Sequence, residues 1–326
     1  MKIQIIAIMM LVSLSVSAFS QSPRTSLIEH FTNTRCGVCA ARNPAFYQTL
    51  SAYPSVLHVS FHPSSPYSQC LFSRQNPTEN DSRTKYYNAY GSTPRIAVNG
   101  KIQSTSSSLI TSSALDEANI APSPIEISVM EMQSGNDSIK VRVAVKTTQT
   151  IPHITSTIFV GIVENPVNYN APNGENIHHD VFRKALTAIV GNSITLPMLH
   201  DSVVFNFTYG VSKDWNINNI YTLAFVQNEE TKEILNASKS KRVVSNPNSV
   251  DESLDDMLVF LPNPVLHRLQ VKNFLLFKNI HYTIFNIVGL PVADGILTGN
   301  DIDVSFLSEG SYYVKVGEVM RKFIKL

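Results

Sequence analysis

Two cysteines separated by two residues, Cys36-Gly37-Val38-Cys39, have the types and spacing in this 326-residue sequence that most directly suggest chemistry. If they follow a strand and begin a helix, the Cys36 thiol lies at the helix N-terminus, where the helix dipole and unpaired N–H groups stabilise a thiolate. Arg35 adds a positive charge beside it. Cys39, one turn later, can attack a mixed disulfide formed at Cys36 and release the product. The spacing therefore predicts thiol–disulfide exchange.

Two other interpretations of the pair stay open. A zinc site needs four ligands, and although Cys70 and His62 are available, the sequence has no second closely spaced pair of ligands. A structural disulfide between Cys36 and Cys39 closes a very short loop, so it would stabilise the fold only weakly. The chain has three cysteines in all, too few for a disulfide-rich scaffold. Cys70 is then a free thiol, a dimer link or a third redox partner.

The elements that must position the pair are short strands and helices. Apolar patterning predicts strands over residues 26–31 and 56–61. It predicts helices over residues 39–50, 82–90 and 109–119. Asn99-Gly100 lies between two further strand-like runs and predicts a hairpin with a type I′ turn. This mixture of strands and helices predicts an α/β layer over the first hundred residues.

A second motif, Ser92-Thr93-Pro94-Arg95, follows in the same stretch. A Cys-x-x-Cys after a strand, a following helix and a later Thr-Pro that leads into a strand make residues 24–120 resemble the thioredoxin superfamily. The resemblance implies that Pro94 is cis and that Thr93 and Pro94 form a substrate-binding loop facing the cysteines.

The same resemblance implies roles for the residues around the pair. Cys36 would be the nucleophile and Cys39 the resolving thiol, and the two would form a disulfide in the oxidised state. Thioredoxins usually carry Trp shortly before the first cysteine, and Arg35 stands immediately before it here. We therefore expect Arg35 to join Thr93 and Pro94 in contacting substrate, with a contact different from the family's apolar one.

The pattern of the sequence changes after Ala121-Pro122-Ser123-Pro124. Strand-like runs with turn signals predict a β-sandwich domain over residues 122–245, interrupted by one helix-like stretch over 179–189. His178, His179 and Asp180, near Glu175, have ligand side chains, but a polar surface loop leading into that helix explains them better. The sandwich carries no chemistry visible in its sequence.

Residues 24–245 as a whole resemble a narrower group, the exported thioredoxin-like proteins related to the twenty-eight-kilodalton outer membrane protein of some Gram-negative bacteria. The run from Glu29 to Cys39 carries this resemblance, together with the stretch over 176–186 that contains His179, Val181 and Arg183. The resemblance indicates the family to which the chain would belong, but it does not indicate a substrate.

Both ends of the chain carry targeting signals. A signal peptide over 1–20 is predicted by Lys2, the apolar run over 5–16 and the small residues around Ser20. The expected thioredoxin-like domain then occupies 21–121. A polar linker is expected over 246–256.

The last region, residues 257–326, resembles the type A sorting domain of the type IX secretion system. Three segments carry this resemblance, Leu261-Pro262-Asn263-Pro264, Gly310 to Val316, and Lys322 to Leu326. It implies a small immunoglobulin-like β-sandwich that contacts the secretion machinery and is then removed. The cargo would be released or attached to surface lipopolysaccharide.

The composition is compatible with this picture. The formal net charge is +1, and charged residues make up 16% of the chain, so there is no basic excess for nucleic acid. We expect a multidomain α/β and all-β protein, exported through the periplasm to the outer membrane surface or beyond, without cofactor or metal. Its expected function is exchange with protein thiols or disulfides. The alternative is a non-catalytic surface binding or structural protein that keeps the thioredoxin fold with a structural disulfide.

Overall fold

The computed structural model describes residues 22–104, 108–133, 137–151, 154–243, 259–272, 280–316 and 319–326. The expected signal peptide over 1–20 and the linker over 246–256 lie outside the described residues. Within the described residues, the helices are too short or too polar for any of them to cross a membrane.

The first region is a small α/β arrangement built on two parallel strands. Strand β2 (Leu27–Phe31) leads through a short loop into helix α1 (Gly37–Ser51), and the chain returns in β3 (Leu57–Phe61), parallel to β2. Strand β4 (Arg95–Val98) runs antiparallel on the other side of β2 and continues into β5 (Lys101–Ile102). The predicted turn is confirmed, because Asn99 and Gly100 join β4 to β5 with positive φ angles of 47° and 84°.

Alternation along β2 divides its side chains between two cores. Ile28 packs with Phe46 of α1 and with Leu115 of helix α4 (Ser112–Ile120). Leu27 and Phe31 face the opposite side, where they pack with side chains from the second half of the chain such as Phe225. Because successive side chains of a strand point to opposite faces, β2 supports α1 on one face and joins the two halves on the other.

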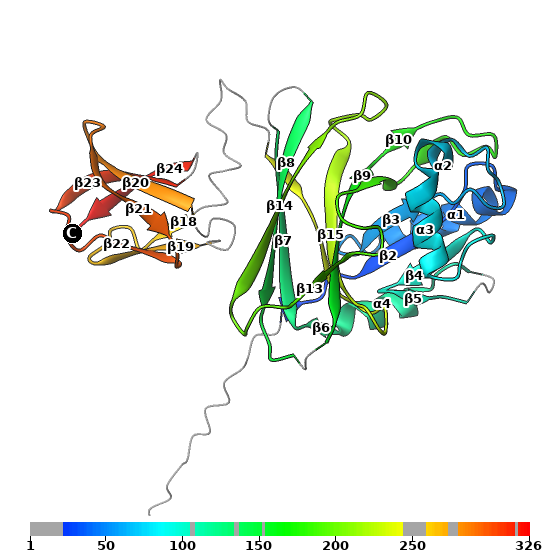
Figure 1. Ribbon diagram of the computed structural model, residues 1–326, viewed down its shortest axis with the longest axis horizontal. Coiled ribbons are helices and arrows are strands. Elements are labelled where there is room, and N and C mark those ends of the chain that lie inside the picture. The colour runs from blue at the N-terminus through cyan, green and yellow to red at the C-terminus, as the bar shows by residue number, and fades with distance from the viewer. Residues whose placement is uncertain are drawn as a thin grey trace, which may run out of the picture.

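The main sheet has nine strands and draws on both halves of the chain (Figure 1). Its path is β16-β15-β9-β12-β3-β2-β4-β5, with β13 also paired to β9. The strands from the second half are β9 (Ser156–Glu164), β12 (Val181–Ala185), β13 (Asn192–Ile194), β15 (Ile220–Asn228) and β16 (Ile234–Lys239). The expected domain boundary at residue 121 therefore does not separate two independent sheets, because β12 pairs with β3.

A second layer gives the expected sandwich its other face. Strands β7 (Ile125–Gln133), β8 (Ser138–Thr147), β14 (Ser202–Gly210) and β17 (Lys241–Val243) form a four-stranded sheet. It packs on β9 and β15 through a core that includes Val143, Ile162 and Val226 (Figure 1). One layer of the sandwich is thus part of the sheet that also carries β2 and α1.

Two helix predictions need correction. The helix expected over 179–189 is absent, and β12 occupies that stretch because its buried Val181 and Phe182 enter the main sheet beside β9. The helix expected over 82–90 starts and ends earlier, as α3 (Pro77–Tyr86). Asn76 caps it by accepting a hydrogen bond from the Glu79 N–H, so the helix starts at a cap that the prediction overlooked.

The C-terminal unit is built from two small sheets around one core. Strands β18 (Val259–Leu261), β19 (Arg268–Lys272) and β22 (Asp301–Asp303) form one of them. The other contains β20 (Ile280–Asn286), β21 (Pro291–Leu297), β23 (Gly310–Val316) and β24 (Val319–Lys325). Leu269, Ile284 and Val314 are among the fully buried residues between them.

Candidate redox site

Cys36 and Cys39 lie where a strand turns into a helix. Cys36 is the N-cap of α1, and its sulfur accepts a hydrogen bond from the Cys39 N–H at 3.0 Å. The two cysteines form a disulfide with a Cα–Cα distance of 5.1 Å. Cys36 is 2% exposed and Cys39 is fully buried, whereas Val38 between them is 56% exposed. The rim of the site is therefore open, and the sulfurs lie just beneath it.

The loop before Cys36 is fixed by side-chain hydrogen bonds. The Asn33 amide donates to the carbonyl oxygens of Pro63 and Tyr67 at 3.0 and 3.1 Å, and its Oδ1 accepts the Arg35 N–H. The Arg35 guanidinium donates to the carbonyl oxygen of Gln69 at 2.9 Å. The segment over 63–70 thus holds the loop from one side, and the charge of Arg35 is held at the rim.

Thr93 and Pro94 face the disulfide, and the peptide bond between them is cis. The Cys36 sulfur lies 3.6 Å from the Thr93 carbonyl oxygen. The hydroxyl of Thr93 is buried and has no hydrogen-bond partner among the described residues.

A third wall of the site comes from far along the sequence. Asn173 donates from its amide to the Cys36 carbonyl oxygen at 3.2 Å, although 137 residues separate them. The carboxylate of Glu175 accepts hydrogen bonds from Asn43 and Asn173. In the sequence, Glu175 stands out only as a neighbour of the histidines, because no local pattern links this segment to the cysteines.

Cys70 is a buried free thiol beside the site. It precedes helix α2 (Leu71–Gln75), and its sulfur accepts a hydrogen bond from the Thr34 hydroxyl at 3.1 Å. It packs with Phe72 and Val181, and it is not bonded to the disulfide. The structure therefore places Cys70 in a small apolar cluster rather than at the open rim.

The histidines of this region are mostly buried and spread over several clusters. His58 contacts Asp180 at 2.9 Å, and its other ring nitrogen lies 3.4 Å from that of His30. Burial, followed by the charge of nearby histidines, lowers the pKa of His30 and His62 well below 6.5. His178 and His179 also have lowered pKa values, chiefly through burial. In the part of the chain that the structure describes, no three His, Cys, Asp or Glu side chains form a metal-binding group.

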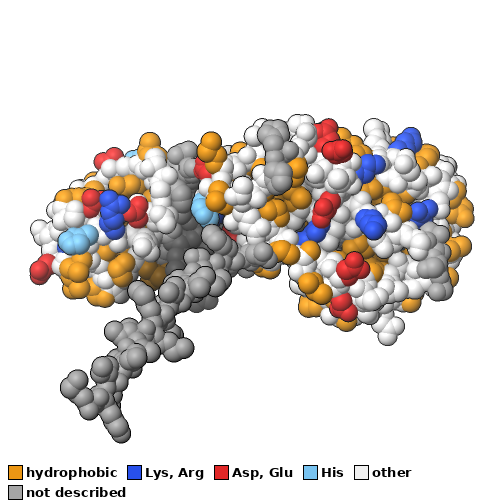
Figure 2. All heavy atoms as spheres, turned by 90° about the horizontal axis from the view of Figure 1, so that it is seen from below, with side chains coloured by type: hydrophobic (Ala, Val, Ile, Leu, Met, Phe, Trp, Pro, Cys, Tyr) orange, Lys and Arg blue, Asp and Glu red, His pale blue; other side chains and the backbone are white. Residues whose placement is uncertain are grey.

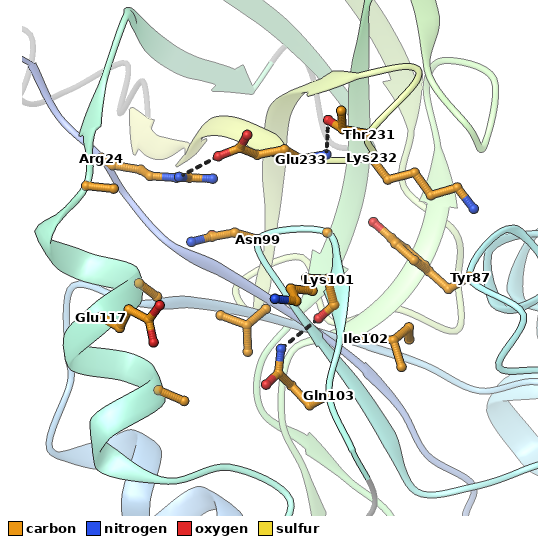
Figure 3. A pocket seen from close by; sticks show the side chains of 15 residues that line it. Arg24, Tyr87, Asn99, Lys101, Ile102, Gln103, Glu117, Thr231, Lys232 and Glu233 are labelled. Atoms are coloured by element: carbon orange, nitrogen blue, oxygen red, sulfur yellow. Dashed lines mark hydrogen bonds and ion pairs between the residues drawn. The ribbon is translucent and has the colours of Figure 1, made fainter.

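A groove lies away from the disulfide. It has a volume of about 760 Å³ and runs between α4, the β4–β5 hairpin and the turn at 231–233. Figure 3 shows Arg24 reaching across it to Glu233, and Lys101 and Glu117 among its lining residues. Neither cysteine of the disulfide lines this groove.

On the face shown in Figure 2, charges of both signs are interspersed.

Fold and site together define a β-rich, multi-sheet protein with one disulfide at a strand-to-helix junction and a separate β unit at its C-terminal end. Residues 80–246, slightly more than half of the chain, match the family of outer membrane protein Omp28. The chain belongs to this family. Residues 259–325 match the secretion system C-terminal sorting domain. These two matches place the protein at the outer membrane surface or in the extracellular space, and the sorting domain implies contact with the secretion machinery.

The chain was also compared with solved structures, and the first of the two below adds a likeness of fold. HBP35 of Porphyromonas gingivalis is similar with a TM-score of 0.56 and 16% identity, covering 94% of this chain and 98% of that one. A domain of the outer membrane lipoprotein Omp28 from Porphyromonas gingivalis has a TM-score of 0.30 and 20% identity, over 38% of this chain and 92% of that one. A search of curated proteins finds no match.

Proposed function

We propose that this cell-surface protein carries out thiol–disulfide exchange through Cys36 and Cys39, held in a thioredoxin-like unit. One observation carries the proposal: Cys36 caps α1 and its sulfur lies 3.6 Å from the Thr93 carbonyl oxygen, next to the cis Pro94. A helix N-terminus stabilises a thiolate, and the neighbouring loop offers backbone groups to an extended partner.

The arrangement of elements supports the proposal. α1 connects the parallel strands β2 and β3, and the antiparallel β4 begins directly after Pro94. This is the order of elements that the thioredoxin resemblance implies. It brings the loops before α1 and before β4 to the same end of the sheet, so that the two motifs meet although 57 residues separate Cys36 from Thr93.

The proposed substrates are protein thiols or disulfides. A partner thiolate attacks the Cys36 sulfur, the Cys36–Cys39 bond breaks, and Cys39 leaves as a thiolate that takes up a proton. The partner then remains as a mixed disulfide on Cys36. Arg35, Thr93 and Pro94 would contact its backbone and side chains. The exposed Val38 adds an apolar surface at the same rim. After removal of the sorting domain, attachment to lipopolysaccharide would keep this activity on the cell.

The reduction potential of the pair tests this proposal. The purified full chain is equilibrated with glutathione redox buffers, with Cys70 blocked, and the Cys36→Ser and Cys39→Ser variants serve as controls. We expect a potential between about −270 and −120 mV, the range of working oxidoreductases, and loss of exchange in the Cys36→Ser variant. A potential below about −300 mV, or no exchange with a model disulfide, would reject the exchange function.

Two observations favour a second candidate. Cys36 is only 2% exposed, and Arg35 is fixed to Gln69 rather than free to meet a partner. These features also suit a surface binding protein in which the disulfide is structural. In that case the Cys36→Ser variant keeps its partner binding and loses only stability, whereas an exchange enzyme loses its activity.

A further inference from the structure

A segment from the second half of the chain binds the loop that carries the disulfide through several hydrogen bonds. The segment over 171–175 connects two short strands, β10 (Val167–Asn168) and β11 (Ile177–His178). The N–H of Asn173 donates to the Thr34 carbonyl oxygen at 3.2 Å. Its side-chain amide donates to the carbonyl oxygens of Asn33 and Cys36. Asn173 thus contacts the loop on both sides of Arg35.

The contact with Cys36 reaches the first turn of α1. The Cys36 carbonyl oxygen also accepts the Ala40 N–H at 3.1 Å, which is the first backbone hydrogen bond of the helix. Asn173 therefore binds the peptide group at which the helix starts. Because the N-cap sulfur depends on that geometry, any shift of Asn173 moves the sulfur relative to the helix N–H groups.

Glu175 joins this contact to the buried face of α1. One carboxylate oxygen accepts a hydrogen bond from Asn173 at 2.6 Å, and the other accepts one from Asn43 at 2.7 Å. Asn43 is 2% exposed, lies one turn after Cys39, and also donates to the Thr32 hydroxyl at 3.1 Å. The carboxylate bridges two amides that hold opposite ends of the disulfide segment, and it is itself partly buried.

We propose that Glu175 is a positioning residue that sets the redox poise of the Cys36–Cys39 pair. Its negative charge is linked to the Cys36 peptide group through Asn173 and opposes the formation of a thiolate at Cys36, so it disfavours the reduced form and makes the disulfide harder to reduce. Among the charged groups in the contacts described around the pair, Arg35 acts in the opposite sense. The inference rests on the proposed exchange function. It adds that Glu175, a residue from the second half of the chain, sets how easily the Cys36–Cys39 disulfide is reduced.

The first test measures the Cys36 thiol alone. In a full chain carrying Cys39→Ser and Cys70→Ser, the rate of alkylation by iodoacetamide is followed against pH, with and without Glu175→Gln. Glutamine keeps the shape and loses the charge, and it keeps one of the two acceptor oxygens. We expect Glu175→Gln to lower the pKa of Cys36 and raise its alkylation rate at neutral pH about threefold or more. Glu117→Gln on the exposed face of α4 is the matched control and leaves the rate unchanged.

The second test uses the native cysteines. Two molecules of reduced glutathione supply two electrons: the first attacks Cys36 and expels Cys39, and the second attacks the glutathione sulfur and releases oxidised glutathione and the Cys36 thiolate. We expect Glu175→Gln to raise the equilibrium constant for this reduction at least about threefold. Asn173→Ala removes the hydrogen bonds of the Asn173 side chain and keeps the charge of Glu175. It therefore separates the effect of geometry on the reduction equilibrium from the effect of charge.

Two outcomes overturn the inference. If Glu175→Gln changes neither the pKa of Cys36 nor the reduction equilibrium by more than twofold, the carboxylate is only a structural bridge. If it makes reduction less favourable, the sign of the proposed effect is wrong. The alkylation test reads the Cys36 thiol directly, so it gives an answer even when the wild-type chain exchanges with no protein and the proposed function itself fails.

Discussion

Glu29 and Arg83 form an ion pair in the interior of the protein, with Arg83 Nε donating to Glu29 Oε1 at 2.6 Å and both side chains fully buried. The second carboxylate oxygen of Glu29 and a further N–H group of Arg83 also have hydrogen-bond partners. The Tyr87 hydroxyl donates to the other Glu29 oxygen, and Arg83 donates to the side-chain oxygen of Gln227 at 3.2 Å. The network joins β2, α3 and β15, so it ties the two halves of the chain together.

Removing one partner of this pair leaves the other buried and unpaired. We expect Arg83→Ala or Glu29→Ala alone to lower the free energy of unfolding by about 3–5 kcal/mol. The combined variant Glu29→Leu with Arg83→Met is expected to lose less, because no uncompensated charge remains. Urea unfolding of all three chains measures this. A double variant less stable than either single one would show that the pair is not the source of the loss.

Acid is expected to destabilise the fold through two buried histidines. Burial, aided by neighbouring histidines, holds the pKa of His30 and His62 well below the ordinary value of 6.5 in the folded chain. The unfolded chain therefore binds more protons below about pH 6.5, and stability falls as pH falls through that value, by at most about 1.4 kcal/mol per pH unit for each histidine.

The pH dependence is measured by unfolding the protein between neutral and mildly acidic pH. His30→Gln removes one titrating group and is expected to reduce the slope of stability against pH, whatever it does to stability at neutral pH. A slope unchanged from wild type would mean that other groups cause the acid sensitivity.

The tight approach of two turns makes Gly100 irreplaceable. Its φ is +84°, and a Cβ added there would lie 1.7 Å from the carbonyl oxygen of Lys232. We expect Gly100→Ala to destabilise the protein by more than the roughly 1 kcal/mol that a left-handed conformation costs a non-glycine residue. Gly91 has a similar φ of +86° and only an ordinary contact with Ser65, so Gly91→Ala is the control. Equal losses in thermal unfolding would contradict the steric explanation.

Asn33 is expected to control how readily the disulfide is reached. Asn33→Ala leaves the carbonyl groups of Pro63 and Tyr67 without their side-chain donor, which costs about 1–3 kcal/mol for buried groups. The loop before Cys36 is then less fixed, so dithiothreitol is expected to reduce the disulfide faster. Asn218→Ala, on an exposed loop, is the control. An unchanged rate of reduction would show that Asn33 does not limit access.

The C-terminal unit is expected to determine export. Asn263 accepts the Ile324 N–H at 2.9 Å and donates to the Lys322 carbonyl oxygen at 3.3 Å, so two of the sorting segments hold each other. We expect deletion of residues 322–326, which removes most of β24, to leave the protein in the periplasm, and Asn263→Ala to reduce export partially. Cell fractionation measures both. Normal surface delivery of the truncated chain would show that this strand is dispensable.

The sequence predicted those parts of the fold that local patterns determine. Strand β2, strand β3 and the Asn99-Gly100 turn lie where apolar runs and turn residues indicated. The segments at 261–264, 310–316 and 322–326 predicted the sorting domain because they lie in order within one short region. The cysteine pair was found for the same reason, since its spacing is local.

The features that depend on distant contacts were not predictable. The sequence predicts a helix where β12 lies, because the stretch around Val181 has no strict alternation and its strand form depends on pairing with β9 and β3. Asn173 and Glu175 reach the disulfide only because the second half of the chain adds strands to the sheet of the first. No spacing in a single sequence records such a contact.

The pairing of β12 with β3 bears on any attempt to isolate the part of the chain that carries the disulfide. A fragment that ends at residue 121 would leave β3 as an edge strand paired only with β2 and would expose Val59 and Phe61, which are fully buried in the whole chain. Bare apolar edges recruit strands from other molecules, so such a fragment should aggregate rather than report the properties of the cysteines. We therefore expect the properties of Cys36 and Cys39 to be measurable only with the second half of the chain attached.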